Sequence, residues 1–243
     1  IGTLYRAAKE VGGDYYDFVK VGDEVWGLVV ADVSGKGVPA SMVMMMIRTA
    51  LRLEARGKRS AAEVLDHVNS FVTADMKKGM FVTMFYVVLD SRERELTYAS
   101  AGHNPLILYR APTQETFFLK PSGFPVGIDL PDETLFGRTM AVERVALEQG
   151  DLLVAYTDGI TEAMNSQKEQ FGTHRLLAAI KHHAHLPPQE FCLQLERELA
   201  DFTGDTPQND DMTLVAIKER LSATDLKVEA RQRAVGYGGD LDA

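Results

Sequence analysis

The sequence is poor in cysteine and lacks the spacings that bind zinc. Cys192 is the only cysteine among 243 residues, which excludes an internal disulfide framework and a cysteine-based zinc site. No CxxC or HxxxH spacing occurs either. A chain that does without disulfides suits a reducing compartment, so we expect a cytoplasmic location. Cys192 falls in a helical pattern, where we expect it to be buried.

Basic residues and long apolar runs are also scarce. There are 26 Lys and Arg against 35 Asp and Glu, a net charge of -9, and no basic stripe, which argues against a nucleic-acid partner. The most hydrophobic stretch, 38–53, is too short to cross a bilayer and is interrupted by Arg48 and Arg52. We therefore expect no membrane contact by this domain. The chain starts at Ile1 within a strand-like pattern, which we interpret as a fragment of a longer protein.

The order of the predicted elements indicates an α+β fold. Strands and helices come in blocks, which favours antiparallel sheets over βαβ alternation. Many strands are apolar on both faces, which fits sheets packed on each other with helices outside. The segments 121–135 and 158–172 are predicted as loops. We predict one domain over 1–220 and a C-terminal tail or linker over 221–243. Four main helices are expected, at 38–56, 61–78, 172–185 and 188–203.

One aspartate, Asp32, stands near the end of an apolar strand predicted over 28–33. A buried carboxylate costs free energy unless it is paired, hydrogen-bonded or bound to a metal. The turn that follows contains Gly35 and Gly37, which allow a sharp bend and a close approach of the backbone to a ligand. Taken alone, this stretch supports a helix-capping role and a metal-binding role for Asp32 equally.

Four further aspartates occupy similar positions. Asp14 follows two glycines, Asp158 ends an apolar strand, and Asp210 and Asp211 precede the last strand. An all-oxygen cluster of this kind suits Mg²⁺ or Mn²⁺. Carboxylates from distant parts of the chain would repel one another without cations. Two ions bridged by one aspartate would relieve that repulsion, lower the pKa of a bridging water and clamp a phosphoryl group.

Five motifs occur in a fixed order: Gly12-Gly13-Asp14-Tyr15-Tyr16-Asp17, Ala31-Asp32-Val33-Ser34-Gly35-Lys36-Gly37, Ala101-Gly102-His103-Asn104-Pro105, Tyr156-Thr157-Asp158-Gly159 and Asp210-Asp211-Met212-Thr213. Together they resemble the metal-dependent Ser/Thr protein phosphatase (PPM) family, and within it the bacterial branch of sporulation and stress-response phosphatases. The resemblance extends from residue 3 to about residue 219. It implies an αββα sandwich in which helix pairs flank two central antiparallel sheets.

The resemblance also implies a centre of two Mn²⁺ or Mg²⁺ ions, or three, at one edge of the sandwich. Asp32 would bridge two ions, and the Val33 carbonyl would help to hold one of them. Asp158 and Asp210 would hold the first ion. Asp14 would bind the second ion directly or through water.

The remaining acids of these motifs are expected in lesser roles. Asp211 follows the last ligand and belongs to the metal site in a supporting role, with the alternative that the two adjacent aspartates have exchanged roles. Asp17 is expected to make hydrogen bonds in or near a turn. His103 is expected to tie its own turn by hydrogen bonds.

The sequence departs from the eukaryotic branch of this family beside Asp32. Where that branch has a histidine assigned as the general acid, this sequence has Ser34. The leaving group must then be protonated by another group, and Lys36 and a metal-bound water are the candidates. The arginine nearest to Asp14 in the sequence is Arg6, on the preceding strand, so phosphate binding is expected to depend largely on the metals.

The resemblance implies a protein phosphatase that hydrolyses phosphoserine or phosphothreonine with a metal-activated water, acting through Asp32 and Asp158. The implied substrate is a phosphorylated antagonist of an anti-sigma factor in a bacterial signalling pathway. Two alternatives are a catalytically silent binding module of the same fold and a two-metal hydrolase of small phosphoesters. Further expected partners are an upstream N-terminal sensor or receiver domain and a second copy in a homodimer. The helices at 38–56 and 61–78 could transmit a signal, because they follow Asp32 directly.

Overall fold

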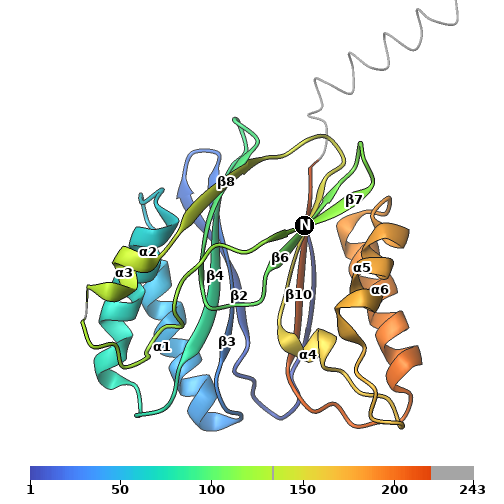
Figure 1. Ribbon diagram of the computed structural model, residues 1–243, viewed down its shortest axis with the longest axis horizontal. Helices are drawn as coiled ribbons and strands as arrows, with labels where there is room; N and C mark the ends of the chain where they lie inside the picture. Colours follow the sequence, from blue (N-terminus) through green and yellow to red (C-terminus); the bar gives the residue numbers. More distant parts are fainter. Residues whose placement is uncertain (133, 220–243) are drawn as a thin grey trace, which may run out of the picture.

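The computed structural model describes residues 1–132 and 134–219, which form a four-layer sandwich (Figure 1). Two antiparallel sheets lie in the middle, each with five strands in this part of the chain. Their strand orders are β1-β10-β9-β6-β7 and β2-β3-β4-β5-β8. Helices cover the outer face of each sheet, which confirms the predicted α+β sandwich. The predicted tail, 221–243, lies outside the described residues.

Segments far apart in the sequence pair within each sheet. β1 (Gly2–Arg6) pairs with β10 (Met212–Lys218), and β10 pairs in turn with β9 (Leu152–Tyr156). In the other sheet the first three strands are successive antiparallel neighbours. The remaining strands are β2 (Tyr15–Gly22), β3 (Val25–Val33), β4 (Val82–Asp90), β5 (Glu95–Ala101), β6 (Leu106–Arg110), β7 (Glu115–Leu119) and β8 (Val142–Ala146).

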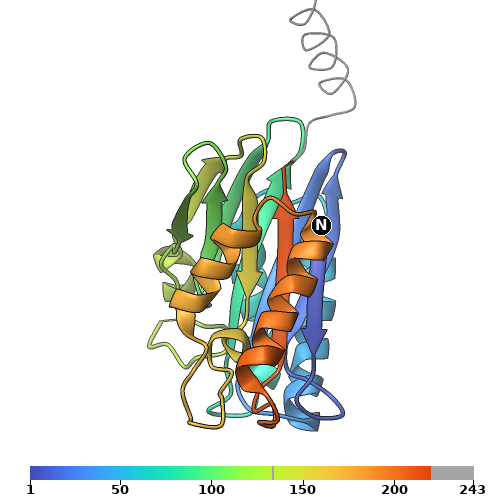
Figure 2. The ribbon, with the colours of Figure 1, turned by 90° about the vertical axis from the view of Figure 1, so that its right-hand side faces the viewer.

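A helix pair covers each outer face. The pair α1 (Val38–Glu54) and α2 (Ala61–Val72) packs on the sheet that contains β3 and β4. The pair α5 (Gly172–His183) and α6 (Pro188–Thr203) covers the other sheet (Figure 2). Among the described residues, no helix combines the length and the apolar character that crossing a membrane requires.

Three apolar layers hold the sandwich together, and β3 shows how its sequence serves two of them. Side chains alternate between the two faces of a strand. Val29 therefore packs toward α1 and α2, whereas Leu28 and Val30 pack between the sheets. The third layer joins β9 and β10 to α5 and α6, and it contains the buried Cys192. A strand that packs against helices on one face and against the other sheet on its other face must be apolar on both faces.

The observed boundaries differ from the predicted ones where short turns intervene. α2 ends at Val72 instead of 78, and a 3₁₀ turn, Thr73–Asp75, follows it. Two short helices, α3 (Leu135–Thr139) and α4 (Asp158–Thr161), begin where the sequence predicts a loop. Helices of four or five residues are too short to show an apolar period.

The antiparallel pairing brings several strand ends to one end of the sandwich. The start of β2 lies beside the end of β3, because Tyr15 pairs with Ala31. The start of β10 lies beside the end of β9, because Leu214 pairs with Tyr156. The residues next to these four strand ends include all five aspartates singled out in the sequence, at positions 14, 32, 158, 210 and 211.

The start of β9 carries a buried aspartate that is fully compensated. The side chain of Asp151 is 0% exposed and lies 2.6 Å from an Arg110 guanidinium nitrogen. It also accepts hydrogen bonds from the backbone amides of Ala111 and Glu148, at 2.9 and 2.8 Å. Asp151 thus fastens the turn before β9 to the end of β6.

We expect Asp151→Ala to lower the free energy of unfolding by about 3 kcal/mol, because it removes the shortest ion-pair contact of Arg110 and leaves two backbone amides without their acceptor. Urea unfolding followed by circular dichroism measures this loss. Glu148→Ala is the matched control, because Glu148 is 57% exposed and also contacts Arg110. It should cost less than about 1 kcal/mol. Equal effects of the two substitutions would contradict the assignment.

Candidate metal centre

Three of the predicted carboxylate ligands line one pocket. Asp32 from β3, Asp158 from the start of α4 and Asp210 before β10 border a pocket of about 330 Å³. Within the described residues, Lys36 is the only Lys or Arg among its lining residues. The carboxylates therefore outnumber the cations in the pocket. The other lining residues are Val33, Ser34, Gly35, Phe81, Thr83, Gly102, His103 and Asn104.

Asp32 lies opposite Thr83 of β4, one residue before the end of β3. Burial raises the pKa of its carboxyl to about 7, and the charges of Asp158 and Asp210 act in the same direction. The protein atoms alone thus do not compensate a negative charge on Asp32. A cation bound in the pocket would do so.

Asp158 is the first residue of α4, directly after the end of β9. Burial raises its pKa, and the charges of Glu162 and Asp210 raise it further. Gly159 allows α4 to lie against the start of β10, because a Cβ at that position would collide with the backbone carbonyl of Asp211. The glycine of this motif therefore sets how closely Asp158 approaches Asp210.

Asp14 is only 4% exposed and does not line the pocket. Its Oδ2 accepts hydrogen bonds from the hydroxyls of Thr157 and Thr213, at 2.7 and 2.6 Å. Burial raises its pKa to about 8, against the lowering effect of these hydrogen bonds, and the charge of Asp32 contributes in the same direction as burial. Asp14 is thus a nearby, more deeply buried carboxylate, held from the opposite sheet.

The adjacent aspartates before β10 point to different surroundings. Asp210 faces the pocket, and one of its oxygens lies 2.8 Å from the Lys36 ammonium. Asp211 is buried, and its two oxygens accept hydrogen bonds from the backbone amides of Ala8 and Gly13, at 2.8 and 2.6 Å. Asp211 therefore shapes the turn that carries Asp14.

Ser34 and His103 are both engaged in hydrogen bonds at the wall of the pocket. The Ser34 hydroxyl accepts a hydrogen bond of 2.9 Å from the backbone amide of Phe81. The His103 Nε2 lies 3.2 Å from the carbonyl oxygen of Tyr156, and its Nδ1 lies 2.8 Å from the Thr83 hydroxyl. A carbonyl only accepts, so Nε2 carries the proton. Burial lowers the pKa of His103 to about 4, so it is neutral and ties β4 to β9.

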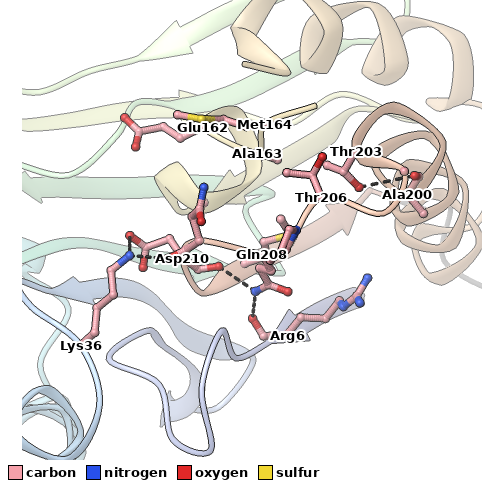
Figure 3. A pocket seen from close by; sticks show the side chains of 15 residues that line it. Arg6, Lys36, Glu162, Ala163, Met164, Ala200, Thr203, Thr206, Gln208 and Asp210 are labelled. Atoms are coloured by element: carbon pink, nitrogen blue, oxygen red, sulfur yellow. Dashed lines mark hydrogen bonds and ion pairs between the residues drawn. The ribbon is translucent and has the colours of Figure 1, made fainter. Parts of the chain in front are cut away.

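A second pocket, of about 250 Å³, adjoins the first (Figure 3). Lys36 and Asp210 line both pockets, whereas Arg6 lines only the second. The Arg6 guanidinium lies 3.9 Å from Glu196. Gln208 also lines this pocket. It donates to the backbone carbonyls of Arg6 and Asp210, at 2.8 and 2.7 Å, and so joins the end of β1 to the segment before β10.

Sequence reasoning missed the side chains that hold the aspartates in place. Thr157 and Thr213 hold Asp14. The sequence did indicate these two residues, because each lies in a motif that also contains Asp158 or Asp210. Gln208 has no comparable signal in the sequence. Asp17 makes the expected hydrogen bonds, since it accepts from the Tyr15 hydroxyl and pairs with Arg52 of α1.

The donor chemistry fits hard divalent cations. The pocket offers carboxylate oxygens from Asp32, Asp158 and Asp210, with the Val33 backbone beside them, and oxygen donors suit Mg²⁺ and Mn²⁺. Among the described residues, no three acidic, histidine or cysteine side chains already stand close enough to form a ready-made ligand set. The raised pKa values of Asp32 and Asp158 agree with a cluster that lacks sufficient positive charge.

Similar proteins are known in bacteria. The chain is 31% identical over 224 residues to the phosphoserine phosphatase RsbU of Bacillus subtilis, covering 91% of this chain and 63% of RsbU. It is 28% identical over 245 residues to the protein IcfG of Synechocystis, covering 89% of this chain and 37% of IcfG. The chain thus spans less than two thirds of the length of either relative.

Solved structures share the fold. The RsbU and RsbW domains of Rv1364c from Mycobacterium tuberculosis match with a TM-score of 0.76 and 28% identity, covering 98% of this chain and 69% of that one. The SiaA-PP2C domain of Pseudomonas aeruginosa matches with a TM-score of 0.77 and 24% identity, covering 89% and 84%. The model of the family described as Stage II sporulation protein E (SpoIIE) matches residues 22–220. The chain therefore belongs to the SpoIIE family, is similar to RsbU, and has the fold of PP2C-type domains.

Proposed function

We propose that this domain is a Mn²⁺- or Mg²⁺-dependent protein phosphatase that hydrolyses phosphoserine or phosphothreonine. The observation that carries the proposal is the meeting of Asp32, Asp158 and Asp210 in one pocket, in a chain related to a phosphoserine phosphatase. Each carboxylate comes from a different strand end, and the cluster has one lysine to balance it among the described lining residues. Such an arrangement is costly unless cations bind there.

In this proposal the cations are held by Asp32, Asp158 and Asp210, together with the Val33 carbonyl. Asp14, which is more deeply buried, would bind the second ion directly or through water. When bound, the ions would supply an activated water for in-line attack on phosphorus and would neutralise the charge of the phosphoryl group. The protein's own task is to keep the carboxylates in place. The hydrogen bonds from Thr157 and Thr213 to Asp14 do this on the buried side of the site.

The leaving-group oxygen needs a proton, and the residues around the pocket narrow the choice of donor. Ser34 stands where the eukaryotic branch has its histidine, and its hydroxyl already accepts from the Phe81 amide. His103 is neutral, and both of its ring nitrogens are hydrogen-bonded. Lys36 and water remain as donors in this proposal.

The proposed substrate is a phosphorylated protein, of the type that antagonises an anti-sigma factor in bacterial signalling, acted on in the cytoplasm. The similarity to RsbU supports this choice. Small, highly charged phosphoesters fit less well, because Lys36 is the only described Lys or Arg that lines the carboxylate pocket. A sensor or receiver domain N-terminal to this one, and a second copy in a homodimer, complete the proposed set of partners.

Regulation in this proposal acts through α1. The Ser41 hydroxyl of α1 donates to the Gly12 carbonyl at 2.7 Å, in the turn before Asp14, and Arg52 pairs with Asp17 at 2.6 Å. A shift of α1 would therefore move the turn that carries Asp14. An engineered disulfide between α1 and β2 tests this, since only a buried native cysteine competes. Unchanged activity and unchanged response to an upstream domain would count against it.

We expect Asp32→Asn and Asp158→Asn each to lower Mn²⁺-dependent hydrolysis of a phosphoserine protein roughly 1,000-fold, because each removes a charged oxygen that holds an ion. Release of phosphate is the measurement. Asp23→Asn is the control, because Asp23 is 90% exposed and lies in the turn between β2 and β3. Retained activity in either pocket variant would overturn the mechanism. Absence of Mn²⁺ binding by calorimetry would favour a silent module, and faster turnover of nucleotides would favour a small-molecule hydrolase.

We expect the metal-free domain to lose stability as the pH rises from about 5.5 to about 7.5. The pKa of Asp14 is about 8 in the folded protein, against the ordinary 3.8 of an aspartate in the unfolded chain. Between these values the folded protein binds more protons, so the free energy of unfolding falls as pH rises, by about 2 kcal/mol from Asp14 alone. Urea unfolding in the presence of a chelator measures this dependence.

Asp14→Asn should flatten this pH dependence, and Asp23→Asn should leave it as in the wild type. A wild-type profile that is flat or rises over this interval would show that the carboxylate of Asp14 is compensated in some other way.

A further inference from the structure

Lys36 lines both pockets, and Figure 3 shows it beside Asp210 at the second one. It lies in the turn between β3 and α1, four residues after Asp32. Its ammonium is 2.8 Å from a carboxylate oxygen of Asp210 and also donates to the backbone carbonyl of Asn209. Lys36 therefore holds the segment before β10 at the point where that segment presents Asp210 to the pocket.

The ammonium is the positive charge that the carboxylate pocket itself supplies. Among the described residues, no other Lys or Arg lines that pocket. Arg6 lies in the neighbouring pocket, and it makes an ionic contact with Glu196, 3.9 Å away. An ammonium on Asp210 and a divalent cation on the same oxygen exclude each other, because both take the same lone pairs and repel one another.

The lysine is held loosely enough to be displaced. Its side chain is 41% exposed and that of Asp210 is 37% exposed, and ion pairs this exposed contribute about 0–1 kcal/mol. The turn that carries it has Gly35 and Gly37 at φ values of 95° and 74°. A Cβ at Gly35 would meet nothing within 4 Å, so no neighbouring side chain is packed against the turn there.

We propose that Lys36 is a built-in counter-cation of the carboxylate pocket, which competes with the divalent metal for Asp210 and thereby sets the metal concentration at which the site fills. This inference rests on the proposed function, because it requires that the pocket binds metal. It gives Lys36 a role in the metal-free protein, separate from any part that it plays in proton transfer. The role is that of a positioning residue, since Lys36 acts through Asp210.

The test is calorimetric titration of the whole chain with MnCl₂ in a buffer free of phosphate and chelator. We expect Lys36→Met to bind Mn²⁺ about three- to fivefold more tightly than the wild type, because the competing ion pair is gone. Lys36→Arg keeps the charge and should stay within about twofold of the wild type. Lys36→Gln serves as a second neutral variant should the methionine variant fold poorly, and it should also bind more tightly.

The matched control is Lys20→Met, which removes a lysine that is 62% exposed on β2 and lies 4.0 Å from Asp23. It should leave the affinity for Mn²⁺ unchanged, which separates a local effect from a change in net charge. A second readout is thermal unfolding in a chelator. There, Lys36→Met should unfold at a lower temperature than the wild type, because the carboxylates lose their counter-cation.

The outcomes separate this inference from the proposed function. If the wild type binds Mn²⁺ and Lys36→Met binds it equally or more weakly, the counter-cation role is overturned and the proposed function stands. If the wild type does not bind Mn²⁺, both are overturned. Tighter binding by both neutral variants, with the arginine and Lys20 variants unchanged, supports the role assigned to Lys36.

Discussion

Repulsion among carboxylates at one end of the sandwich is the constraint on which the rest of this structure depends. Antiparallel pairing sets the end of β3, the end of β9 and the start of β10 at that end, and each contributes an aspartate. Burial and mutual repulsion raise the pKa values of Asp32 and Asp158. The three apolar layers must supply the free energy that keeps this end assembled, because the site itself supplies little of it without a cation.

The start of β9 shows what a purely structural aspartate looks like in the same fold. Asp151 is as deeply buried as Asp14, but it has an arginine and two backbone amides around it. Asp14 has two hydroxyls and further carboxylates as neighbours, and its pKa rises to about 8. The charge of Asp151 is balanced by Arg110, whereas the two hydroxyls that donate to Asp14 carry no charge to balance it. That contrast, more than burial alone, distinguishes this end of the sandwich as the candidate functional site.

Much of the fold followed from the sequence, because long apolar periods and runs report directly on helices and on strands buried on both faces. α1, α5 and α6 were predicted within about two residues at their ends for this reason. α4 could not be predicted, because its four residues are fixed by packing of Gly159 on the Asp211 carbonyl. Such a contact depends on the tertiary structure and leaves no periodic signal.

The site was predictable in its residue types and less so in its geometry. The motifs identified the aspartates, but two adjacent ones carry the same chemistry in the sequence. Only the folded chain distinguishes Asp210, which faces the pocket, from Asp211, whose oxygens bind the amides of Ala8 and Gly13. Likewise, Lys36 beside two glycines gave no indication that its ammonium would reach Asp210, close to the other end of the chain.

The hydrogen bonds behind the pocket couple the two sheets through the site. Asp14 belongs to the β2 end of one sheet, and the hydroxyls that hold it come from Thr157 and Thr213 of the other. Asp211 reaches back from β10 to the turn before β2. Any movement of α1 that displaces this turn therefore strains contacts between the sheets as well as the position of Asp14. A cation that bound this arrangement and not the unfolded chain would therefore also stabilise the fold.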